Sequence, residues 1–307
     1  MKTITERVKE TSNIPNHLRL ERPPFPKKAK IEITSRCDLK CFFCQHTYDP
    51  TPKFDINPEL CFKIIRELKE VGVEDLGLFW IGEPIMVKEL PQYVSYAKEI
   101  GIPYVFLTTN GRLATLERIK PLFDAGLDSI KFSFNADDQE SYKEICGVDA
   151  YNQVVANLKN AAEYRGSNKK PAIYASSVFD PSNPEPFNKI KELISPYVDE
   201  HYPLRLYGTR KIEKKDGSGK ITEAQIDERR SLNDMLPCWA LFTEPHITFD
   251  GHISACYCDH DPRLYMGDLK EMSLLEAWHS DKFVALRQKH LAKDVSGTVC
   301  ESCIAYA

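Results

Sequence analysis

Hydrophobic positions between residues 28 and about 206 follow two alternating patterns. Short apolar runs typical of buried strands are each followed by a longer segment with apolar residues at helical spacing. In segment 58–71, Leu60, Ile64 and Leu68 form an apolar stripe with lysines and glutamates opposite. The patterns predict strands at 29–34, 75–80, 103–108, 129–134, 172–179 and 200–206, and helices at 58–71, 89–100, 115–125, 151–165 and 184–195.

Six strands joined by helices predict parallel pairing, because a parallel connection needs a crossover of this length. Such units form either an open doubly wound α/β sheet or a closed or partial barrel, and periodicity alone does not choose between them. In both folds, functional residues collect at the carboxyl ends of the strands. Cys37, Glu83, the run 109–111 and Asn135 stand at those ends.

The hydrophobic pattern of the chain changes twice after residue 206. Residues 207–237 are polar and predict a linker. Strand-like runs at 247–249 and 253–255 then flank Asp250 and Gly251, a hairpin turn signal, and a helix is predicted at 273–289. We therefore predict an N-terminal extension at 1–27, an α/β domain at 28–206, a linker at 207–237 and a small α+β domain at 238–307.

Charge and hydropathy exclude two classes of partner. The formal net charge of the 307 residues is -4, which provides no broad basic surface for nucleic acid. No apolar stretch approaches the length of a membrane span, and the first 30 residues lack the apolar run of a signal peptide. We expect a cytoplasmic protein that binds neither nucleic acid nor membranes.

The ten cysteines fall into two groups. In a reducing compartment, cysteines that cluster in this way indicate metal binding or catalysis rather than disulfides. Three lie within eight residues near the front of the chain, five lie in its last quarter, and two stand alone. The front group is Cys37, Cys41 and Cys44, the rear group is Cys238, Cys256, Cys258, Cys300 and Cys303, and the isolated pair is Cys61 and Cys146.

The front group has the chemistry of an iron–sulfur site. Thiolates are soft ligands, and three of them can bind three irons of a [4Fe–4S] cluster while the fourth iron stays open to a small molecule. A zinc site would need a fourth ligand, for which His46 is the candidate. Three unligated thiols on a loop are the remaining alternative. The spacing, directly after a predicted strand, favours the cluster.

This CxxxCxxC pattern after a first strand resembles the radical S-adenosylmethionine (SAM) superfamily, which implies a partial (β/α)6 TIM-like barrel. The run Trp80-Ile81-Gly82-Glu83-Pro84 resembles the family's GGEP motif, with Ile81 in place of the first glycine. The resemblance implies that Gly82, Glu83 and Pro84 hold the methionyl ammonium of SAM. It also implies that Thr109, Asn110, Ser133 and Asn135 contact the methionyl part and the ribose, and that Phe43 borders the adenine.

The same resemblance implies an activity. The reduced cluster would donate an electron to SAM, and the resulting 5′-deoxyadenosyl radical would remove a hydrogen atom from an unactivated C–H bond. The protein would supply binding, orientation and exclusion of water. An electron donor such as flavodoxin or ferredoxin is implied as a partner.

The rear cysteines suffice for a second metal site. Four thiols can bind a [4Fe–4S] cluster or a zinc ion, and their spacing alone leaves both open. The order of cysteine, hairpin, cysteine and terminal CxxC resembles the shortened SPASM, or "twitch", extension of radical SAM enzymes. That resemblance implies one auxiliary [4Fe–4S] cluster bound by Cys238, Cys256, Cys300 and Cys303.

Cysteines outside these ligand sets have several interpretations. Cys258 is a small buried hydrophobe, a hydrogen-atom donor of the kind that radical epimerases use, or a replacement for Cys256 as ligand. Cys61 is expected in the core of helix 58–71. Cys146 is predicted to lie in a loop after the fourth strand and is a second candidate hydrogen-atom donor.

The resemblance narrows the substrate only to a class. Segment 266–303 is closest in texture to 2-deoxy-scyllo-inosamine dehydrogenase-like enzymes, which favours dehydrogenation or epimerisation of a sugar, aminocyclitol or nucleotide sugar. A ribosomal-peptide maturase forming a thioether or D-residue is the alternative, and a short N-terminal segment and the lack of cysteines for a third cluster weigh against it. A non-catalytic iron–sulfur or zinc protein is the alternative of another class. The basic run 205–215 either grips a phosphate or carboxylate or is a solvated linker.

Overall fold

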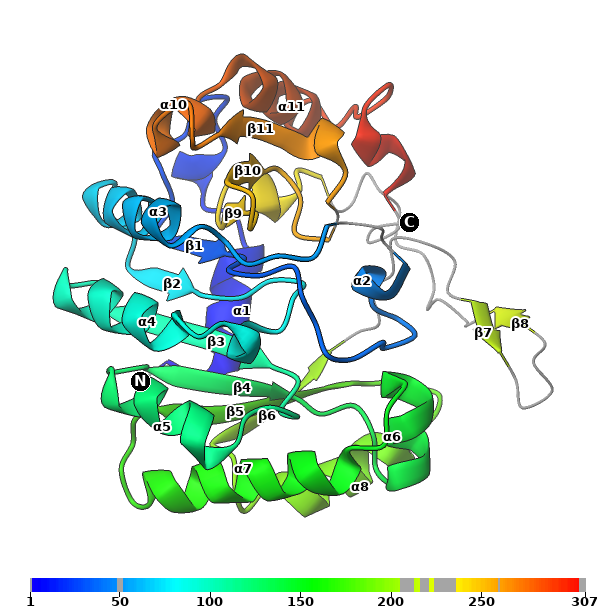
Figure 1. Cartoon of the computed structure of the whole chain (residues 1–307). Helices are drawn as coiled ribbons and strands as arrows, with labels where there is room; N and C mark the ends of the chain where they lie inside the picture. Colours follow the sequence, from blue (N-terminus) through cyan, green and yellow to red (C-terminus); the bar gives the residue numbers. More distant parts are fainter. Residues whose placement is uncertain are drawn as a thin grey trace.

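A curved sheet organises the part of the chain that the computed structural model describes, residues 2–48, 52–204, 213–215, 221–223, 236–258 and 260–303 (Figure 1). Within those residues, the sheet has nine strands in the order β11-β10-β9-β1-β2-β3-β4-β5-β6. The strands are β1 (Lys28–Ile31), β2 (Asp75–Gly77), β3 (Tyr104–Thr109), β4 (Ser129–Ser133), β5 (Ala172–Val178), β6 (Glu200–Leu204), β9 (His246–Ile247), β10 (His252–Ser254) and β11 (Tyr265–Asp268).

Strand direction separates a parallel part from a C-terminal part. Strands β1 to β6 pair in parallel in sequence order, which confirms all six predicted strands and their parallel pairing. Strand β9 adds to β1 in parallel, and β10 and β11 follow in antiparallel pairing. The sheet does not close on itself, since β11 and β6 are its two edges. The parallel part is therefore a partial barrel and not a closed one.

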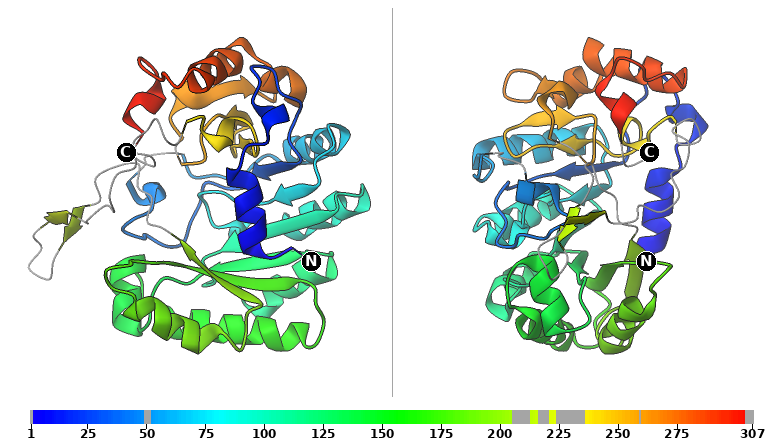
Figure 2. Two further views of the ribbon diagram at one scale, coloured as in Figure 1. Left: turned by 180° about the vertical axis from the view of Figure 1, so that it is seen from behind. Right: turned by 90° about the vertical axis from the view of Figure 1, so that its right-hand side faces the viewer.

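The crossover helices lie together on one side of the parallel strands (Figures 1 and 2). Helix α3 shows why they form: Asn57 caps its first turn, Pro58 stands at its start, and Ile64 and Leu68 are buried. Cys61 of α3 is fully buried, which confirms its predicted place in the core. The crossover helices are α3 (Pro58–Glu70), α4 (Leu90–Glu99), α5 (Leu116–Asp124), α6 (Gln139–Cys146), α7 (Tyr151–Arg165) and α8 (Glu185–Ile194).

Helix α6 corrects one expectation from the sequence. Cys146 is the last residue of this helix, whereas the sequence pattern predicted a loop at this position. Asp138 caps the helix and accepts a hydrogen bond from the Ser141 amide, and Gly147 ends it at a positive φ of 75°. The prediction was wrong because only eight residues make the helix, too few for a clear apolar period.

The N-terminal extension also contains a helix that the sequence reading did not predict. Helix α1 (Ile4–Ser12) begins with a capping box between Thr3 and Glu6. Its Ile4 amide donates to Glu200 at 2.8 Å, and Arg7 pairs with Asp75 at 2.6 Å. Because Glu200 and Asp75 start their strands, α1 crosses the amino-terminal ends of the barrel strands (Figure 2). A second short helix, α2 (Gln45–Tyr48), follows the front cysteines.

The C-terminal segment folds around the predicted hairpin. Strands β9 and β10 are joined by the turn at Asp250 and Gly251, where Gly251 has a φ of +89°. The single helix predicted at 273–289 is instead two helices, α10 (Leu274–Trp278) and α11 (Asp281–Leu291). The interruption has a local cause, because Ser280 caps α11 by accepting a hydrogen bond from the Phe283 amide.

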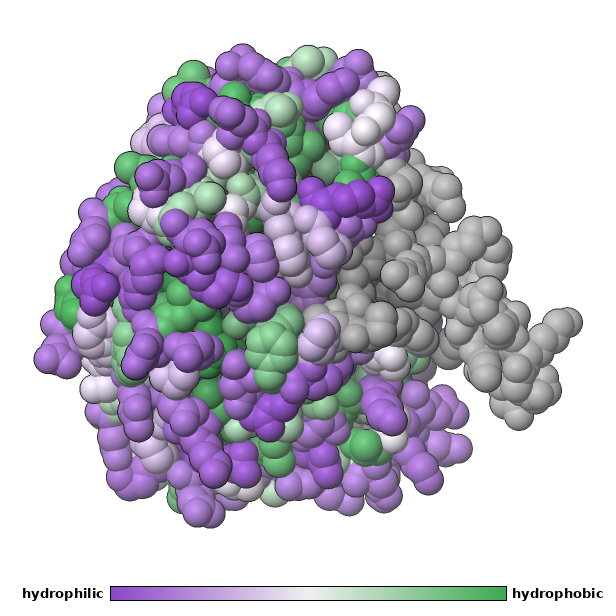
Figure 3. Space-filling view, turned by 45° about the horizontal axis from the view of Figure 1, so that its top comes forward, coloured by the Kyte–Doolittle hydropathy of each residue, from purple (hydrophilic) through white to green (hydrophobic). Residues whose placement is uncertain are grey.

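The predicted linker falls mostly outside the described residues. Within it, β7 (Glu213–Lys215) and β8 (Ile221–Glu223) form a two-stranded antiparallel pair. Positions 205–212 of the basic run lie outside the described residues. Hydrophilic side chains cover most of the face seen in Figure 3, and no described helix is both long and apolar enough to cross a membrane.

Candidate active site

The loop after β1 carries the three front cysteines and is fixed by polar contacts. Cys37, Cys41 and Cys44 are each partly exposed on it. Arg36, at its start, makes a two-pronged contact with Asp55 at 2.8 and 2.6 Å. Asp38, one residue after Cys37, accepts hydrogen bonds from the Asn110 side chain at 2.7 Å and from Arg112 at 3.0 Å. These contacts tie the loop to the end of β3.

Helix α6 supports the same loop from behind. The Lys40 amide donates to the Cys146 carbonyl and the Phe42 amide donates to the Ile145 carbonyl, both at 3.0 Å. The Cys146 side chain is 4% exposed and hydrogen-bonds to the thiol of Cys41. The C-terminus of α6 is therefore part of the support of the cysteine loop, which the sequence reading did not foresee.

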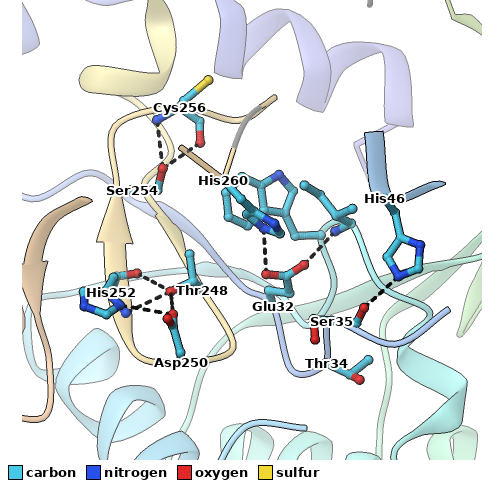
Figure 4. Close-up of polar contacts among 12 residues, drawn as sticks. Glu32, Thr34, Ser35, His46, Thr248, Asp250, His252, Ser254, Cys256 and His260 are labelled. Atoms are coloured by element: carbon cyan, nitrogen blue, oxygen red, sulfur yellow. Dashed lines mark hydrogen bonds and ion pairs between the residues drawn. The ribbon is translucent and has the colours of Figure 1, made fainter. Parts of the chain in front are cut away.

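The front thiols have the properties of cluster ligands. Burial raises the pKa of Cys37 to about 12 and that of Cys44 to about 11, and the hydrogen bond with Cys146 raises the pKa of Cys41. Thiolates at these positions therefore need a cation to replace their protons, and the iron of a cluster would supply it. His46 does not complete a zinc set: its Nε2 lies 2.8 Å from the Ser35 carbonyl (Figure 4). No three His, Cys, Asp or Glu side chains among the described residues group around a single ion. The three thiols of a [4Fe–4S] site bind three different irons and need not surround one ion. The three front cysteines therefore fit a cluster better than a single metal ion.

The Gly82-Glu83-Pro84 turn lies directly against the start of the cysteine loop. The Glu83 amide donates to the Arg36 carbonyl at 2.8 Å. A Cβ atom on Gly82 would lie 2.0 Å from the Thr34 carbonyl oxygen, so only glycine allows this approach. Ile81 occupies the position of the family's other glycine. Its amide donates a hydrogen bond to the Glu32 side chain at 3.3 Å. The turn and the cysteines thus form one continuous surface at the carboxyl ends of β1 and β2.

Glu83 is a buried carboxylate with room for one more partner. Its oxygens accept hydrogen bonds from the Ile85 amide at 3.1 Å, the Thr109 hydroxyl at 2.8 Å and the Asn110 amide at 2.6 Å. A carboxylate offers about four acceptor positions, so about one remains. Burial raises the pKa of Glu83 to about 7, which a neighbouring cation would offset. These features fit the ammonium group of SAM.

The other residues expected to contact SAM occupy the neighbouring strand ends. Ser133 ends β4 and is partly exposed, and the Asn135 side chain accepts a hydrogen bond from the Val178 amide at 2.9 Å. Phe43 lies on the cysteine loop, edge-on to Phe42 at 5.3 Å. Pro84 is buried at the start of a 3-10 turn. The structure brings these side chains to one edge of the sheet, and their contacts with SAM stay a prediction.

Four of the rear cysteines, Cys256, Cys258, Cys300 and Cys303, come together from two segments. The Cys258 amide donates to the Cys256 sulfur at 3.3 Å, and the hydrogen bond between the two thiols, together with burial, raises the pKa of Cys258. Burial raises the pKa of Cys300 to about 12, with Cys256 and Cys303 close enough to add to the shift. Cys238 precedes the 3-10 turn Trp239–Leu241, and its amide donates to His290 Nδ1 at 3.2 Å. Cys258 therefore lies beside the predicted ligand Cys256, and both of its proposed functional roles stay open.

A buried contact between a carboxylate and an imidazole connects the two cysteine regions and was missed in the sequence. Glu32, at 0% exposure just after β1, lies 2.9 Å from Nε2 of His260, which follows the rear cysteines Cys256 and Cys258 (Figure 4). Trp80 packs edge-on against His260 at 4.6 Å and donates its indole N–H to the Tyr257 carbonyl at 2.7 Å. A glutamate inside an apolar strand run was the available signal.

Comparison with protein families agrees with this geometry. Residues 31–194 match the model of the radical SAM superfamily, and residues 238–304 match that of an iron–sulfur cluster-binding domain, SPASM. A protein of Sulfurisphaera tokodaii named probable GTP 3',8-cyclase is 32% identical over 132 residues. The match covers 43% of this chain and 42% of that protein, so the chain spans less than half the length of this relative.

Solved structures share the fold at low sequence identity. Streptococcus suis SuiB bound to S-adenosylmethionine has a TM-score of 0.70 at 18% identity, over 92% of this chain and 72% of SuiB. BtrN in complex with AdoMet and 2-DOIA has a TM-score of 0.56 at 16% identity, over 87% of both chains. The family match implies a [4Fe–4S] cluster with SAM, and the SPASM match implies auxiliary iron–sulfur binding. The chain belongs to the radical SAM superfamily.

Proposed function

We propose that this enzyme removes a hydrogen atom from a small hydroxylated molecule, namely a sugar, aminocyclitol or nucleotide sugar. The observation that carries this proposal is a set of polar side chains on the inner face of the barrel strands, below the edge that holds the cysteine loop and the Glu83 turn. Thr108, Lys131 and Ser133 on that face are all partly exposed. Hydroxyl and ammonium groups suit a substrate rich in hydroxyl groups better than an apolar one.

The proposed ligand sets follow the two cysteine regions. Cys37, Cys41 and Cys44 hold the cluster that binds SAM, and the auxiliary cluster is held by Cys238, Cys256, Cys300 and Cys303. When bound, the first cluster and SAM supply reductive SAM cleavage and a 5′-deoxyadenosyl radical. The proposed domains are the radical SAM barrel at 28–206, a linker at 207–237 and the twitch-like domain at 238–307. We expect a flavodoxin or ferredoxin as reductant and a cytoplasmic location.

Two outcomes of hydrogen removal place different demands on the chain. Dehydrogenation leaves an electron to be accepted, and the rear cysteines would hold an acceptor. Epimerisation needs a thiol that returns a hydrogen atom to the substrate. Cys258 is the better candidate because it is partly exposed, whereas Cys146 is 4% exposed.

Two other substrate classes have support among the similar proteins. SuiB bound to its precursor peptide SuiA has a TM-score of 0.68 over 98% of this chain, which supports a peptide substrate. The relatives named probable GTP 3',8-cyclase support a nucleotide and a ring-forming outcome. The polar inner face is compatible with a nucleotide, which makes cyclisation of such a substrate the second candidate.

The test of the proposed function is reductant-dependent formation of 5′-deoxyadenosine from SAM by the anaerobically reconstituted enzyme. We expect formation that rises when the correct sugar or nucleotide sugar is present. Deuterium transfer from a labelled substrate into 5′-deoxyadenosine would identify the C–H bond attacked. If only a peptide stimulates the reaction, the small-molecule assignment is wrong. If SAM is neither cleaved nor bound with both clusters present, the chain is a non-catalytic metalloprotein.

A further inference from the structure

The inner face of β4 carries a lysine without a partner. Ile130 and Phe132 are fully buried, and Phe132 lies beside Val154 of α7 next to Gly111, so these two side chains face the helices. Because side chains alternate along a strand, Lys131 points to the opposite, inner face. Within the part of the chain that the structure describes, no hydrogen bond or ion pair engages its ammonium group.

The charged side chains near Lys131 pair with each other and not with Lys131. Across the inner face, Lys30 of β1 pairs with Glu244 at 2.6 Å, and the Glu244 side chain is 5% exposed. Lys30 also contacts the position of Gly77, where a Cβ atom would lie 2.9 Å from its Cγ, so its stem lies on the inner face. Burial, with the nearby charge of Lys30, holds the pKa of His246 well below its ordinary value, so that ring is neutral. Among Lys30, Glu244 and Lys131, the Lys131 ammonium is therefore the charge without a partner in the described part of the chain.

The depth of Lys131 places it where a substrate would lie. On β4 it precedes Ser133, the predicted SAM contact, by two residues, which is about 6–7 Å along the strand. Thr108 of β3 and Tyr174 of β5 are its neighbours in register. A group held at Lys131 would therefore lie one layer below SAM, between hydroxyl-bearing side chains.

We propose that the Lys131 ammonium binds an anionic group of the substrate, either a phosphate or a carboxylate. The inference rests on the proposed function, because that function makes the inner face the substrate side. It narrows the substrate from sugars in general to those that carry such an anion. Burial and the nearby charge of Lys30 lower the pKa of Lys131 to about 8, which is the cost of keeping a cation here without a partner. An anion at this position removes that cost.

Anion binding can be measured without reductant and without the true substrate. Pyrophosphate and glutarate serve as separate probes, added to the reconstituted enzyme with SAM and followed by calorimetry. We expect one of the two probes to bind at one equivalent and to protect Lys131 from acetylation, as read by peptide mass spectrometry. Binding of pyrophosphate alone indicates a phosphorylated substrate, and binding of glutarate alone indicates a carboxylate.

Three variants test the role of the ammonium itself. Lys131→Met should weaken binding of the effective probe by about 10- to 100-fold, whereas Lys131→Arg should retain most of it. The matched control Lys282→Met removes an exposed lysine from α11 and should bind normally. The melting temperature of Lys131→Met should not fall, because no hydrogen bond or ion pair of the ammonium within the described residues is lost.

Two results would overturn the proposal. One is that neither probe binds or protects Lys131 in the unaltered enzyme. The other is that Lys131→Met binds the probes as tightly as the unaltered enzyme while its melting temperature falls, which would make Lys131 a structural residue. Loss of SAM cleavage in the unaltered enzyme would instead remove the proposed function and leave the anion measurement standing.

Discussion

The two cysteine regions of this protein are built in opposite ways. The front three thiols lie within eight residues of one loop, so their spacing alone indicates their chemistry. At the rear, Cys256 and Cys258 lie on one segment, and only the fold brings Cys300 and Cys303 near them. The front site can thus be identified from local sequence, whereas the rear site depends on the correct folding of the C-terminal segment.

The contacts that support the two regions also differ, because those of the front loop are partly exposed and those of the rear region are buried. The front loop is tied by ion pairs such as Arg36–Asp55, whose side chains are 35% and 32% exposed. The rear region has buried supports: Arg287 lies 3.9 Å from the ring centroids of both Trp278 and Phe283, and all three residues are buried. Substitutions should therefore affect chemistry more than stability in front, and both together at the rear.

The largest expected effect is loss of activity from the front loop. Replacing Cys41 by Ala should reduce 5′-deoxyadenosine formation to background, because a front cluster with two thiolates cannot present its open iron correctly. Iron and absorbance of the rear cluster should remain. The matched control Cys61→Ala removes a buried thiol from α3 and should lower stability by about 1 kcal/mol without loss of cleavage. Undiminished cleavage by Cys41→Ala would refute the ligand assignment.

Next in size is the loss of the rear cluster. Replacing Cys300 by Ala should remove about half of the bound iron, as expected for two four-iron clusters. Because the rear thiols draw on several segments, the melting temperature should fall as well, unlike that of Cys41→Ala. Cys258→Ala provides the comparison: retained iron with lost product would support a donor role, and lost iron would make Cys258 a ligand. An unchanged iron content in Cys300→Ala would contradict the assignment of Cys300.

A pair of glycine substitutions sharpens the contrast. Gly82→Ala places a Cβ atom 2.0 Å from a backbone carbonyl, which cannot move aside, so SAM affinity should fall by about tenfold or more. Gly267→Ala, in β11, places a Cβ atom 2.9 Å from the flexible Met272 side chain and 2.7 Å from Ala277 Cβ. It should lower the melting temperature and leave SAM affinity unchanged. Equal effects of the two on SAM binding, measured by equilibrium dialysis, would show that the regions are not separable.

The smallest expected effect is the pH dependence of anion binding at Lys131. The free ammonium has a pKa of about 8, so affinity should be constant below about pH 7 and fall by up to about tenfold per pH unit above 8. Of the groups that face Lys131, Lys30 is paired with Glu244, His246 has a pKa well below its usual value, and burial raises the pKa of Tyr174. Lys131→Arg should flatten the profile, since a guanidinium stays charged. A sloping profile in that variant would assign the titration to another group.

Long periodic elements and local motifs were predictable from sequence. The six parallel strands and five of their crossover helices follow from apolar spacing, and the turn at Gly251 follows from its dipeptide. Helices α1 and α6 were missed because each is short and is defined by its capping residues and tertiary contacts. The break between α10 and α11 depends on the cap at Ser280, which an apolar period does not reveal.

Site features that join distant segments were not predictable. The supports of the cysteine loop at Asp38 and Cys146 come from β3 and α6, and no spacing in the sequence connects them. The contact between Glu32 and His260 joins residues more than two hundred positions apart. In the sequence, Lys131 is an ordinary lysine of an alternating strand. Its proposed role in anion binding could be inferred only from the structure, which pairs Lys30 with Glu244 and leaves Lys131 unpaired among the described residues.

The pairing of β9 with β1 determines what happens when the C-terminal segment is removed from the barrel. Strand β1 would be the exposed edge of the barrel sheet if the C-terminal segment were removed, and edge strands with free amides pair with other molecules. Removal would also leave Glu32 as a buried carboxylate without His260. A truncated barrel is therefore prone to aggregate, and grafting this C-terminal segment onto another barrel requires transfer of the β1 edge with it.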